Sequence, residues 1–398
     1  MTKNRQPPMN ALDRRAFLQR LGLVTFTVGV GPSILAACGG SDSDSSSGGA
    51  PEQLDSSGTV GGTVNFLSWE GYDLPDPLAD WRSQNAVEVA ATFIGNHDDI
   101  QAKIKAGGAA SGYDVITYYQ GYKNLYSELD ILTQIDESKV PNIKNLFPYF
   151  ASDVGGFWTS DGVRTGIPFT FGAQGLTYDS DAMPELPSWY DLLDPKFTGK
   201  VGMVDDATGV LTMGCHLLGL DPGALKKADL PKVVDLTKRF VAQTRGVSAS
   251  YGDLTQQLVS GDIQAIYIGW AAVNAFAADA GKATVTTSLP KEGAYSFCDS
   301  FAIPSTAKNV ATVLSWMNAV MDPAVNAAAA DGLVGGTTVA DSVPLLSETT
   351  RSLYPYDDLE GFLTKAPFYP NPPVESDEFI TGTEWKTAWG ELKQSAGA

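Results

Sequence analysis

A carboxylate and two aromatic rings share one face of a short extended segment in the second half of the chain. Residues 289–304 read LPKEGAYSFCDSFAIP, which predicts a glycine turn, a strand and a proline stop. Because side chains alternate along a strand, Tyr295, Phe297 and Asp299 share a face. That face suits an organic cation, since the carboxylate pairs with an ammonium group and the rings cover the rest. The alternative is a half-buried edge strand with a solvated aspartate.

Further aromatic residues follow predicted strands in the first part of the chain. The patterns predict strands at 63–69, 87–93 and 113–119 with helices between them, as in an α/β domain with a largely parallel sheet. Ligands of such sheets bind beyond the carboxyl ends of the strands. Four aromatic residues fall at or just after these ends, where they either pack or form a ligand wall: Trp69, Tyr72, Tyr119 and Tyr122.

A second α/β unit follows, with a strand that ends in Asp205 and Asp206, a helix at 208–220 and a strand at 262–270. A secreted hydrolase could use two carboxylates, but adjacent residues on a strand face opposite sides and make a poor acid–base pair. The sequence has no nucleophile-elbow, phosphate-loop or zinc-protease motif, and no metal-ligand spacing. It therefore favours a binding protein without metal or cofactor over an enzyme.

The first forty residues are typical of an exported lipoprotein. Arg14 and Arg15 form a twin-arginine pattern, and the apolar run at 21–35 is too short to span a membrane. The Leu-Ala-Ala sequence before Cys38 resembles a lipobox. The resemblance implies that residues 1–37 are a signal peptide and that Cys38 carries the lipid.

Composition extends this picture. Gly, Ser and Asp dominate residues 38–61, which we expect to be a flexible tether. The remaining length suits two domains. The net charge of −19 disfavours nucleic acid as a partner. Cys215 and Cys298 either form a disulfide or remain two buried thiols. We expect an extracytoplasmic protein, held at the membrane by its lipid alone.

The order of these parts resembles the periplasmic polyamine-binding proteins, the solute receptors of spermidine/putrescine ABC importers. The similarity runs from Val64 to the C-terminus. The segments that carry it are FLSWEGY (66–72), YDVI (113–116), QIDESK (134–139), GIPFTFG (166–172), VDDA (204–207), PKEG (290–293) and DSFAIP (299–304).

The resemblance implies a two-lobed α/β fold of the type II periplasmic-binding-protein class, with the ligand cleft between the lobes. Lobe 1 would comprise residues 62–166 and 299–340, and lobe 2 residues 167–298 and 341–398. The hinge strands would lie at 165–169 and 298–302. Such a protein is a monomeric receptor that delivers a small organic cation to ABC permease subunits.

The resemblance also implies roles for individual residues. Asp299 matches the principal ammonium-binding aspartate of the family, and Asp206 matches a second one. Phe297 stands where the family has tryptophan, and Trp270 lies within one or two residues of another family tryptophan. The cleft walls would be formed by Trp69, Tyr72, Tyr119 and Tyr122.

Two departures bear on the ligand. The family often has a glutamate where this chain has Gly209, and a family ring is absent after Gly335 and Gly336. A diamine, or a smaller amine with one polar tail, is therefore as good a candidate as spermidine.

Two different functions are also compatible with the sequence. One is that of a receptor with the same fold for an anion, an amino-acid-like ligand or ferric ion, the last of which would use Tyr118 and Tyr119. The second is that of a lipoprotein with a purely structural role.

Overall fold

The computed structural model describes residues 50–396, apart from 95–99, 101, 105 and 107–111. The predicted signal peptide and Cys38 lie outside the described residues. Among the helices that are described, none has the length and apolar character needed to cross a membrane.

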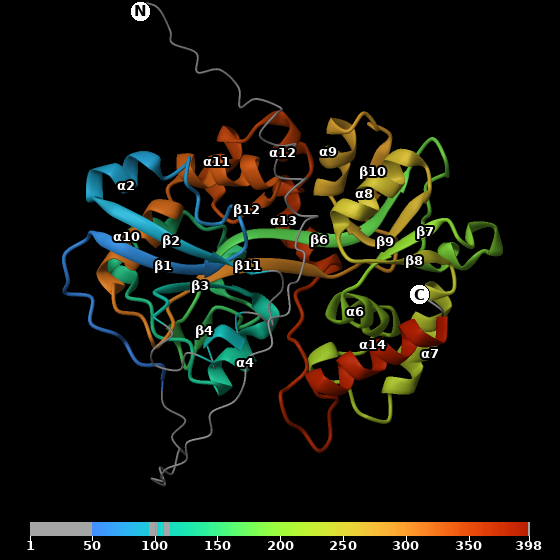
Figure 1. Cartoon of the computed structure of the whole chain (residues 1–398), viewed down its shortest axis with the longest axis horizontal. Helices are drawn as coiled ribbons and strands as arrows, with labels where there is room; N and C mark the ends of the chain where they lie inside the picture. Colours follow the sequence, from blue (N-terminus) through green and yellow to red (C-terminus); the bar gives the residue numbers. More distant parts are fainter. Residues whose placement is uncertain (1–49, 95–99, 101, 105, 107–111, 397–398) are drawn as a thin grey trace, which may run out of the picture.

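The elements keep the labels of Figure 1. The strands are β1 (Gly62–Ser68), β2 (Val87–Phe93), β3 (Val115–Tyr119), β4 (Thr159–Ser160), β5 (Val163–Arg164), β6 (Ile167–Asp179), β7 (Val201–Val204), β8 (Thr244–Ser248), β9 (Ala265–Trp270), β10 (Val285–Ser288), β11 (Ser296–Ala302) and β12 (Gly336–Thr337). The α-helices are α2 (Ala79–Asn85), α4 (Lys123–Glu128), α5 (Pro148–Ser152), α6 (Ala207–Leu218), α7 (Leu230–Val241), α8 (Tyr251–Ser260), α9 (Ala272–Asp279), α10 (Val310–Val320), α11 (Pro323–Leu333), α12 (Glu348–Ser352), α13 (Leu359–Lys365) and α14 (Gly382–Ala396).

One mixed sheet runs through both halves of the molecule (Figure 1). Its main path is β2-β1-β3-β11-β6-β9-β7-β8, and β10 and β12 also pair with β6. β1 is parallel to β2 and β3, and β7 is parallel to β8 and β9. β11 is antiparallel to both β3 and β6. The predicted α/β fold with two lobes is confirmed.

Helices cover both faces of the sheet, as expected for strands that are buried on both sides. In the second half, α8 and α9 lie on one side, whereas α6, α7 and α14 lie on the other (Figure 1). The short strand β9 is buried over nearly its whole length. Its sequence, AIYIGW, is accordingly rich in β-branched and aromatic residues.

Each half has its own apolar core. The first contains Phe66, Phe301 and Trp316, and the second is built around residues such as Trp189 and Tyr267. Two large, separate clusters are what a chain of this length needs.

Residues 341–368 differ from the predicted division of the chain. The resemblance predicts them in lobe 2, but Tyr354, Leu359 and Leu363 are buried in the first core. The Tyr354 hydroxyl donates to the Val334 carbonyl (2.7 Å), and its ring packs against Phe171. These contacts hold the segment against lobe 1.

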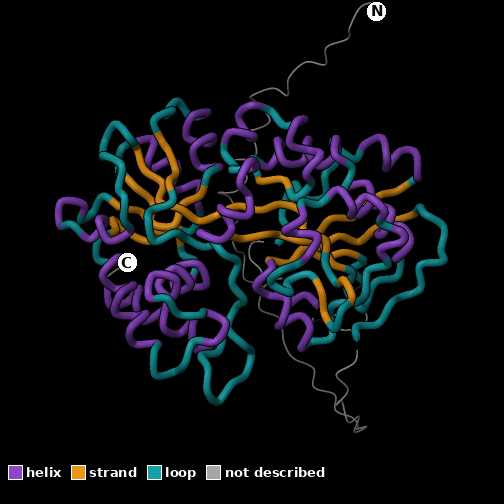
Figure 2. Tube along the Cα trace, turned by 180° about the vertical axis from the view of Figure 1, so that it is seen from behind, coloured by secondary structure: helices purple, strands orange, loops and turns teal. Residues whose placement is uncertain are grey.

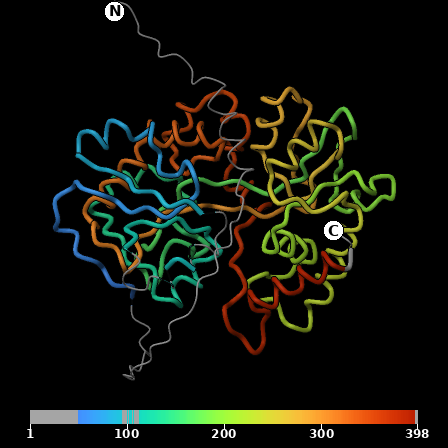
Figure 3. Tube along the Cα trace, viewed as in Figure 1, coloured from blue at the N-terminus to red at the C-terminus, as the bar shows by residue number. Residues whose placement is uncertain are grey.

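Two strands, β6 and β11, carry the chain between the halves. Figure 2 shows them from behind, and Figure 3 shows them in the trace of the chain. The first part of β6 pairs with β11 and β12, and its last part pairs with β9 and β10. A third passage leads from α13 to α14, in the orange-red part of the trace in Figure 3. The predicted hinge segments thus fall in or beside β6 and β11.

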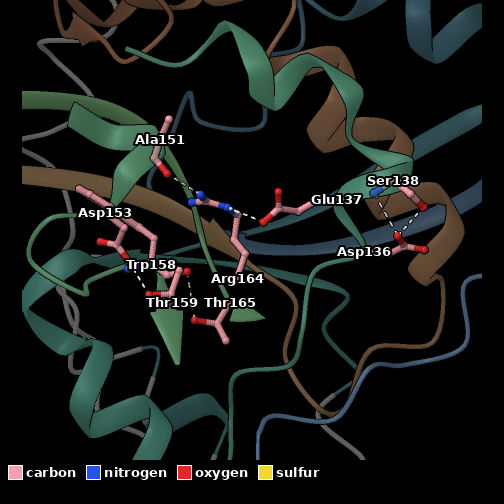
Figure 4. A network of polar contacts seen from close by, with 9 residues as sticks. All are labelled: Asp136, Glu137, Ser138, Ala151, Asp153, Trp158, Thr159, Arg164 and Thr165. Atoms are coloured by element: carbon pink, nitrogen blue, oxygen red, sulfur yellow. Dashed lines mark hydrogen bonds and ion pairs between the residues drawn. The ribbon is translucent and has the colours of Figure 1, made fainter. Parts of the chain in front are cut away.

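A polar network fixes the chain where it enters β6 (Figure 4). Arg164 forms an ion pair with Glu137 (3.0 Å) and donates to the Ala151 carbonyl. Asp153 accepts hydrogen bonds from the Trp158 amide (2.9 Å) and the Thr159 hydroxyl (2.8 Å). The Trp158 indole then donates to Ser300 Oγ on β11 (2.7 Å), so both crossing strands are held from the lobe 1 side.

The described end of the predicted tether is attached to the first half. Gln134 donates its amide hydrogen to the Glu52 carbonyl (2.8 Å), and Leu54 packs on the first core. The Gly61 amide donates to Thr312 Oγ1 (3.0 Å). Residues 50–61 are therefore attached to lobe 1 at Glu52, Leu54 and Gly61, through an apolar anchor and backbone hydrogen bonds.

Candidate functional site

Asp299 lies on β11, where the sheet passes from one half to the other. It is opposite Tyr119 of β3 and Thr170 of β6. Its carboxylate accepts a hydrogen bond from the Tyr72 hydroxyl (2.7 Å to Oδ2), and the residue is only 8% exposed. The structure thus places a buried carboxylate between rings from two predicted wall segments.

Tyr72 reaches Asp299 from the turn that follows β1. Gly71 adopts a positive φ of 87°, a conformation that glycine takes without strain, and the Tyr72 amide donates back to the Trp69 carbonyl (3.3 Å). The Tyr72 ring then packs edge-on against Phe169 (5.3 Å) and Phe301 (6.4 Å). Tyr72 thus contacts both Asp299 and Phe301, on either side of a register shift in β11 between Asp299 and Ser300.

Burial dominates the electrostatics of Asp299. Removal from water raises the pKa of its carboxyl group to about 7, although the hydrogen bond from Tyr72 favours the ionised form. An acid with this pKa is half protonated near neutral pH. A cation beside it would favour the charged form of this carboxyl group.

Asp206 enters from the second half, between β7 and α6. The pKa of Tyr119 is raised first by burial and then by the charges of both Asp206 and Asp299. The pKa of the buried Tyr295 is raised by burial and next by Asp206. Tyr119 is therefore within electrostatic reach of one carboxylate from each half of the molecule, with Asp299 directly opposite it across β3 and β11.

A second aromatic pair lies next to these groups. Trp270, at the end of β9, packs edge-on against Phe297 (5.5 Å between ring centroids). Phe297 lies over Gly172 of β6, where an added Cβ would come 2.6 Å from the ring. The Phe297 ring, packed directly on the backbone of Gly172, offers a flat apolar surface that a chain of methylenes can contact.

Tyr122 and Trp69 both pack against the first core. Tyr122 packs on Tyr119 (6.1 Å), but its ring also stacks on Tyr126 in the first core (6.0 Å). Trp69 is half-buried against the same core. Both remain predicted wall residues.

Tyr251 is missing from our predicted site, and Tyr295 was predicted on the shared face of the strand but without a role of its own. Tyr295 is buried near Asp206, and its place on the same face as Phe297 and Asp299 was a signal in the sequence. Tyr251 is half-buried against the second core, and its pKa is raised first by removal from water and next by the charge of Asp206. It begins α8, the helix before β9, and its proximity to Asp206 comes from the packing of separate elements, so no local pattern indicates it.

The adjacent aspartates point to different surroundings, as predicted. Asp205 accepts from the Trp389 indole (2.7 Å) and pairs with Lys393 (2.7 Å), both on α14. Asp206 instead lies beside the Tyr295 hydroxyl at the first turn of α6. An acid–base couple built from these two carboxylates has no support in this geometry.

The structure also decides the state of the cysteines and of Tyr118. Cys215 and Cys298 are free and buried, one in each core, so they do not form a disulfide with each other. The Tyr118 hydroxyl donates to the Phe157 carbonyl (2.9 Å) within the first core, away from the candidate site. Tyr118 and Tyr119 therefore do not converge as a ferric-ion site would require.

Comparison with known proteins identifies the family. The family model for bacterial extracellular solute-binding proteins matches residues 79–353. The chain belongs to this family. Our predicted resemblance is confirmed, because its relatives include the putrescine-binding periplasmic protein SpuD of Pseudomonas aeruginosa, with 26% identity over 83% of this chain and 91% of the relative. The putrescine-binding periplasmic protein PotF of Escherichia coli is 25% identical over 76% and 85%, respectively.

Solved structures agree on the fold of this solute-binding protein. The TpPotD lipoprotein of Treponema pallidum superimposes with a TM-score of 0.72 at 19% sequence identity, over 84% of this chain and 100% of that one. The observed sheet with crossing strands is thus the two-lobed fold of extracytoplasmic receptors.

Gly209 gives a first test of the site. A Cβ there would lie 2.5 Å from Asp206 Oδ2 and 2.6 Å from the Tyr295 hydroxyl, so the glycine keeps room for both groups. We expect Gly209→Ala to weaken binding of the solute about tenfold, since both groups must move. Calorimetric titration measures this. Gly332→Ala, in α11 with open space around it, is the control, and equal affinities for both variants would contradict the prediction.

Proposed function

We propose that this solute-binding protein binds a polyamine, a diamine or a related small organic cation outside the cytoplasm and delivers it to an ABC permease. The names of the putrescine-binding relatives support this ligand class. It acts without bond chemistry, so it is a receptor and not an enzyme. It works as a monomer, attached to the membrane by lipid on Cys38.

The observation that carries the proposal is the surroundings of Asp299. A buried carboxylate with a pKa raised to about 7 by burial is costly to ionise unless a cation accompanies it. An ammonium group beside Asp299 meets that need, and the second end of the solute lies toward Asp206. Rings of Tyr119, Phe297 and Trp270 cover the methylenes, each of which contributes about 0.8 kcal/mol when buried.

Binding to both halves of the molecule also gives a means of signalling. Asp299 and Tyr72 belong to the first half, and Asp206 and Trp270 to the second. A solute that contacts both halves favours the closed form, and the permease recognises that form. The segments that bend are then parts of β6 and β11.

The main alternative is a receptor of the same fold for a different solute, such as an amino-acid-like molecule. An amine with one polar tail would use Asp299 and leave the Asp206 end to hydrogen bonds from Tyr295. Position 209 is a glycine where the family often has a glutamate, and this missing acidic residue supports the alternative.

Calorimetry on the lipid-free protein tests the proposal. Putrescine, cadaverine, spermidine and agmatine are titrated, with γ-aminobutyrate and glutamate as zwitterionic and acidic comparisons. We expect heat from at least one diamine or polyamine and none from glutamate. Binding of γ-aminobutyrate alone would favour the amino-acid-like alternative, and no heat from any amine would contradict the proposal.

A further inference from the structure

The strand that carries Trp270 has an unusual backbone two residues before it. Ile268 adopts a positive φ of 55° within β9. A β-branched residue rarely enters this left-handed region, and such residues persist only where their surroundings hold them. The distortion lies two residues before Trp270, whose ring contacts Phe297 in the candidate site.

Two side chains meet the displaced carbonyl groups. The Tyr251 hydroxyl donates to the Ile268 carbonyl (2.8 Å). The side-chain amide of Gln174 is oriented with its nitrogen toward the carbonyl oxygens of Ile268 and Gly269. Its Nε2 donates to the Gly269 carbonyl (2.9 Å) and lies 3.3 Å from the Ile268 carbonyl oxygen. In a regular strand, successive carbonyl groups point to opposite edges. One side-chain amide can therefore contact the carbonyls of two successive residues only because the strand is distorted here.

Gly269 completes the arrangement. A Cβ at this position would clash with the side chain of Thr177 on β6, so only glycine lets the two strands approach here. Register also shifts between Gly175 and Thr177, opposite the distorted part of β9. The backbone of β9 is therefore fixed from its partner strand on one side and from Tyr251 on the other.

The direction of Trp270 depends on this backbone. Trp270 pairs with Gln174 across β6 and β9, and Thr287 Oγ1 lies 3.3 Å from its carbonyl oxygen, within donating distance. Its ring ends against Phe297 in the site. A relaxed Ile268 would rotate the following peptides and move the ring away from Phe297.

We propose that Tyr251 is a positioning residue for solute binding, which holds the strained Ile268 peptide and thereby keeps the Trp270 ring against Phe297. The role of Trp270 as a wall of the solute site rests on the proposed function. The holding of Trp270 by Tyr251 is a property of the protein without solute. The two parts can therefore be tested separately.

Near-ultraviolet circular dichroism tests the holding directly. The signal of Trp270 is taken as the difference between the wild type and Trp270→Ala, and the difference is measured again in a Tyr251→Phe background. We expect Tyr251→Phe to reduce this signal at least about twofold, because the freed ring loses its fixed contact. An unchanged signal would overturn the proposal, whether or not any amine binds.

Tyr267→Phe is the matched control. Tyr267 is fully buried on β9, the strand that carries Ile268 and Trp270. Its hydroxyl has no hydrogen-bond partner among the described residues. The variant removes the same atom from a buried tyrosine of the same lobe. We expect it to keep the Trp270 signal, whereas an equal loss in both variants would show a general loosening of the core and overturn the proposal.

A double-mutant cycle then links the holding to solute affinity. Tyr251→Phe is expected to weaken binding of the best amine about tenfold, as loss of one hydrogen bond that orients the site allows. In the Trp270→Ala background the same change should have almost no further effect. An equal loss in both backgrounds would show that Tyr251 acts by another route and overturn the proposal.

Discussion

Asp299→Asn is expected to weaken binding of the preferred diamine or polyamine by at least about 100-fold. The variant keeps the shape of the side chain and an oxygen that accepts from the Tyr72 hydroxyl, but removes the charge that pairs with an ammonium group. Loss of one partner of a buried charge pair costs about 3–5 kcal/mol, and every 1.4 kcal/mol is about tenfold in affinity. Isothermal titration calorimetry at pH 8 measures the change.

Asp205→Asn is the matched control for this result. Asp205 is a neighbour of Asp206 in sequence, but its carboxylate pairs with Lys393 and Trp389 on α14. The change in net charge is the same, so a long-range effect of charge would appear in both variants. If Asp299→Asn binds the amine as tightly as Asp205→Asn does, the proposed ligand class loses its basis.

The second large effect is on the pH dependence of stability without solute. The pKa of Asp299 in the folded protein is about 7, above its ordinary value of 3.8, because burial disfavours the charge. The folded state therefore holds this proton more tightly than the unfolded state. Stability from the protonated carboxyl is fully present below pH 3.8 and is lost as the pH rises through 7. At about 1.4 kcal/mol per pH unit, the loss approaches roughly 4 kcal/mol.

Urea unfolding of the wild type and Asp299→Asn at pH 4.5, 6 and 8 isolates this contribution. We expect the free energies of unfolding to diverge as the pH rises, with the variant becoming the more stable protein at pH 8. The remaining carboxylates titrate equally in both proteins and cancel in the difference. A difference that stays constant with pH would contradict the raised pKa.

Binding should show the reverse dependence. A cation binds the ionised carboxylate, so affinity is expected to fall about tenfold per pH unit below pH 7 and to level off above it. Tyr72 and Tyr119 face the carboxylate, but burial raises the pKa of both phenols, so they keep their protons throughout this range.

Patterns of nearby residues predicted the local elements well. The helix expected at 208–220 is α6 at 207–218, and the strand expected at 87–93 is β2 with the same bounds. The shared face of Phe297 and Asp299 also followed from alternation alone. Such features depend on side chains within a few positions of one another, so the sequence carries them directly.

Packing between distant segments decided the rest. Nothing near residue 354 indicates that its ring is buried beside Phe171, and nothing near Tyr251 indicates that it holds a carbonyl of β9. Local patterns also did not show that Leu54 anchors the end of the tether. Each of these contacts joins different elements of the fold, so it exists only once those elements have packed together.

The sequence by itself determined the type of chemistry, an acidic group among rings on an α/β scaffold, and the family to which the chain belongs. Only the tertiary structure decided how strongly that acid is perturbed and which groups surround it. Burial of Asp299 depends on Tyr72, Tyr119 and the crossing strands closing around it together. The raised pKa follows from the exclusion of water, which no single segment of the sequence can achieve.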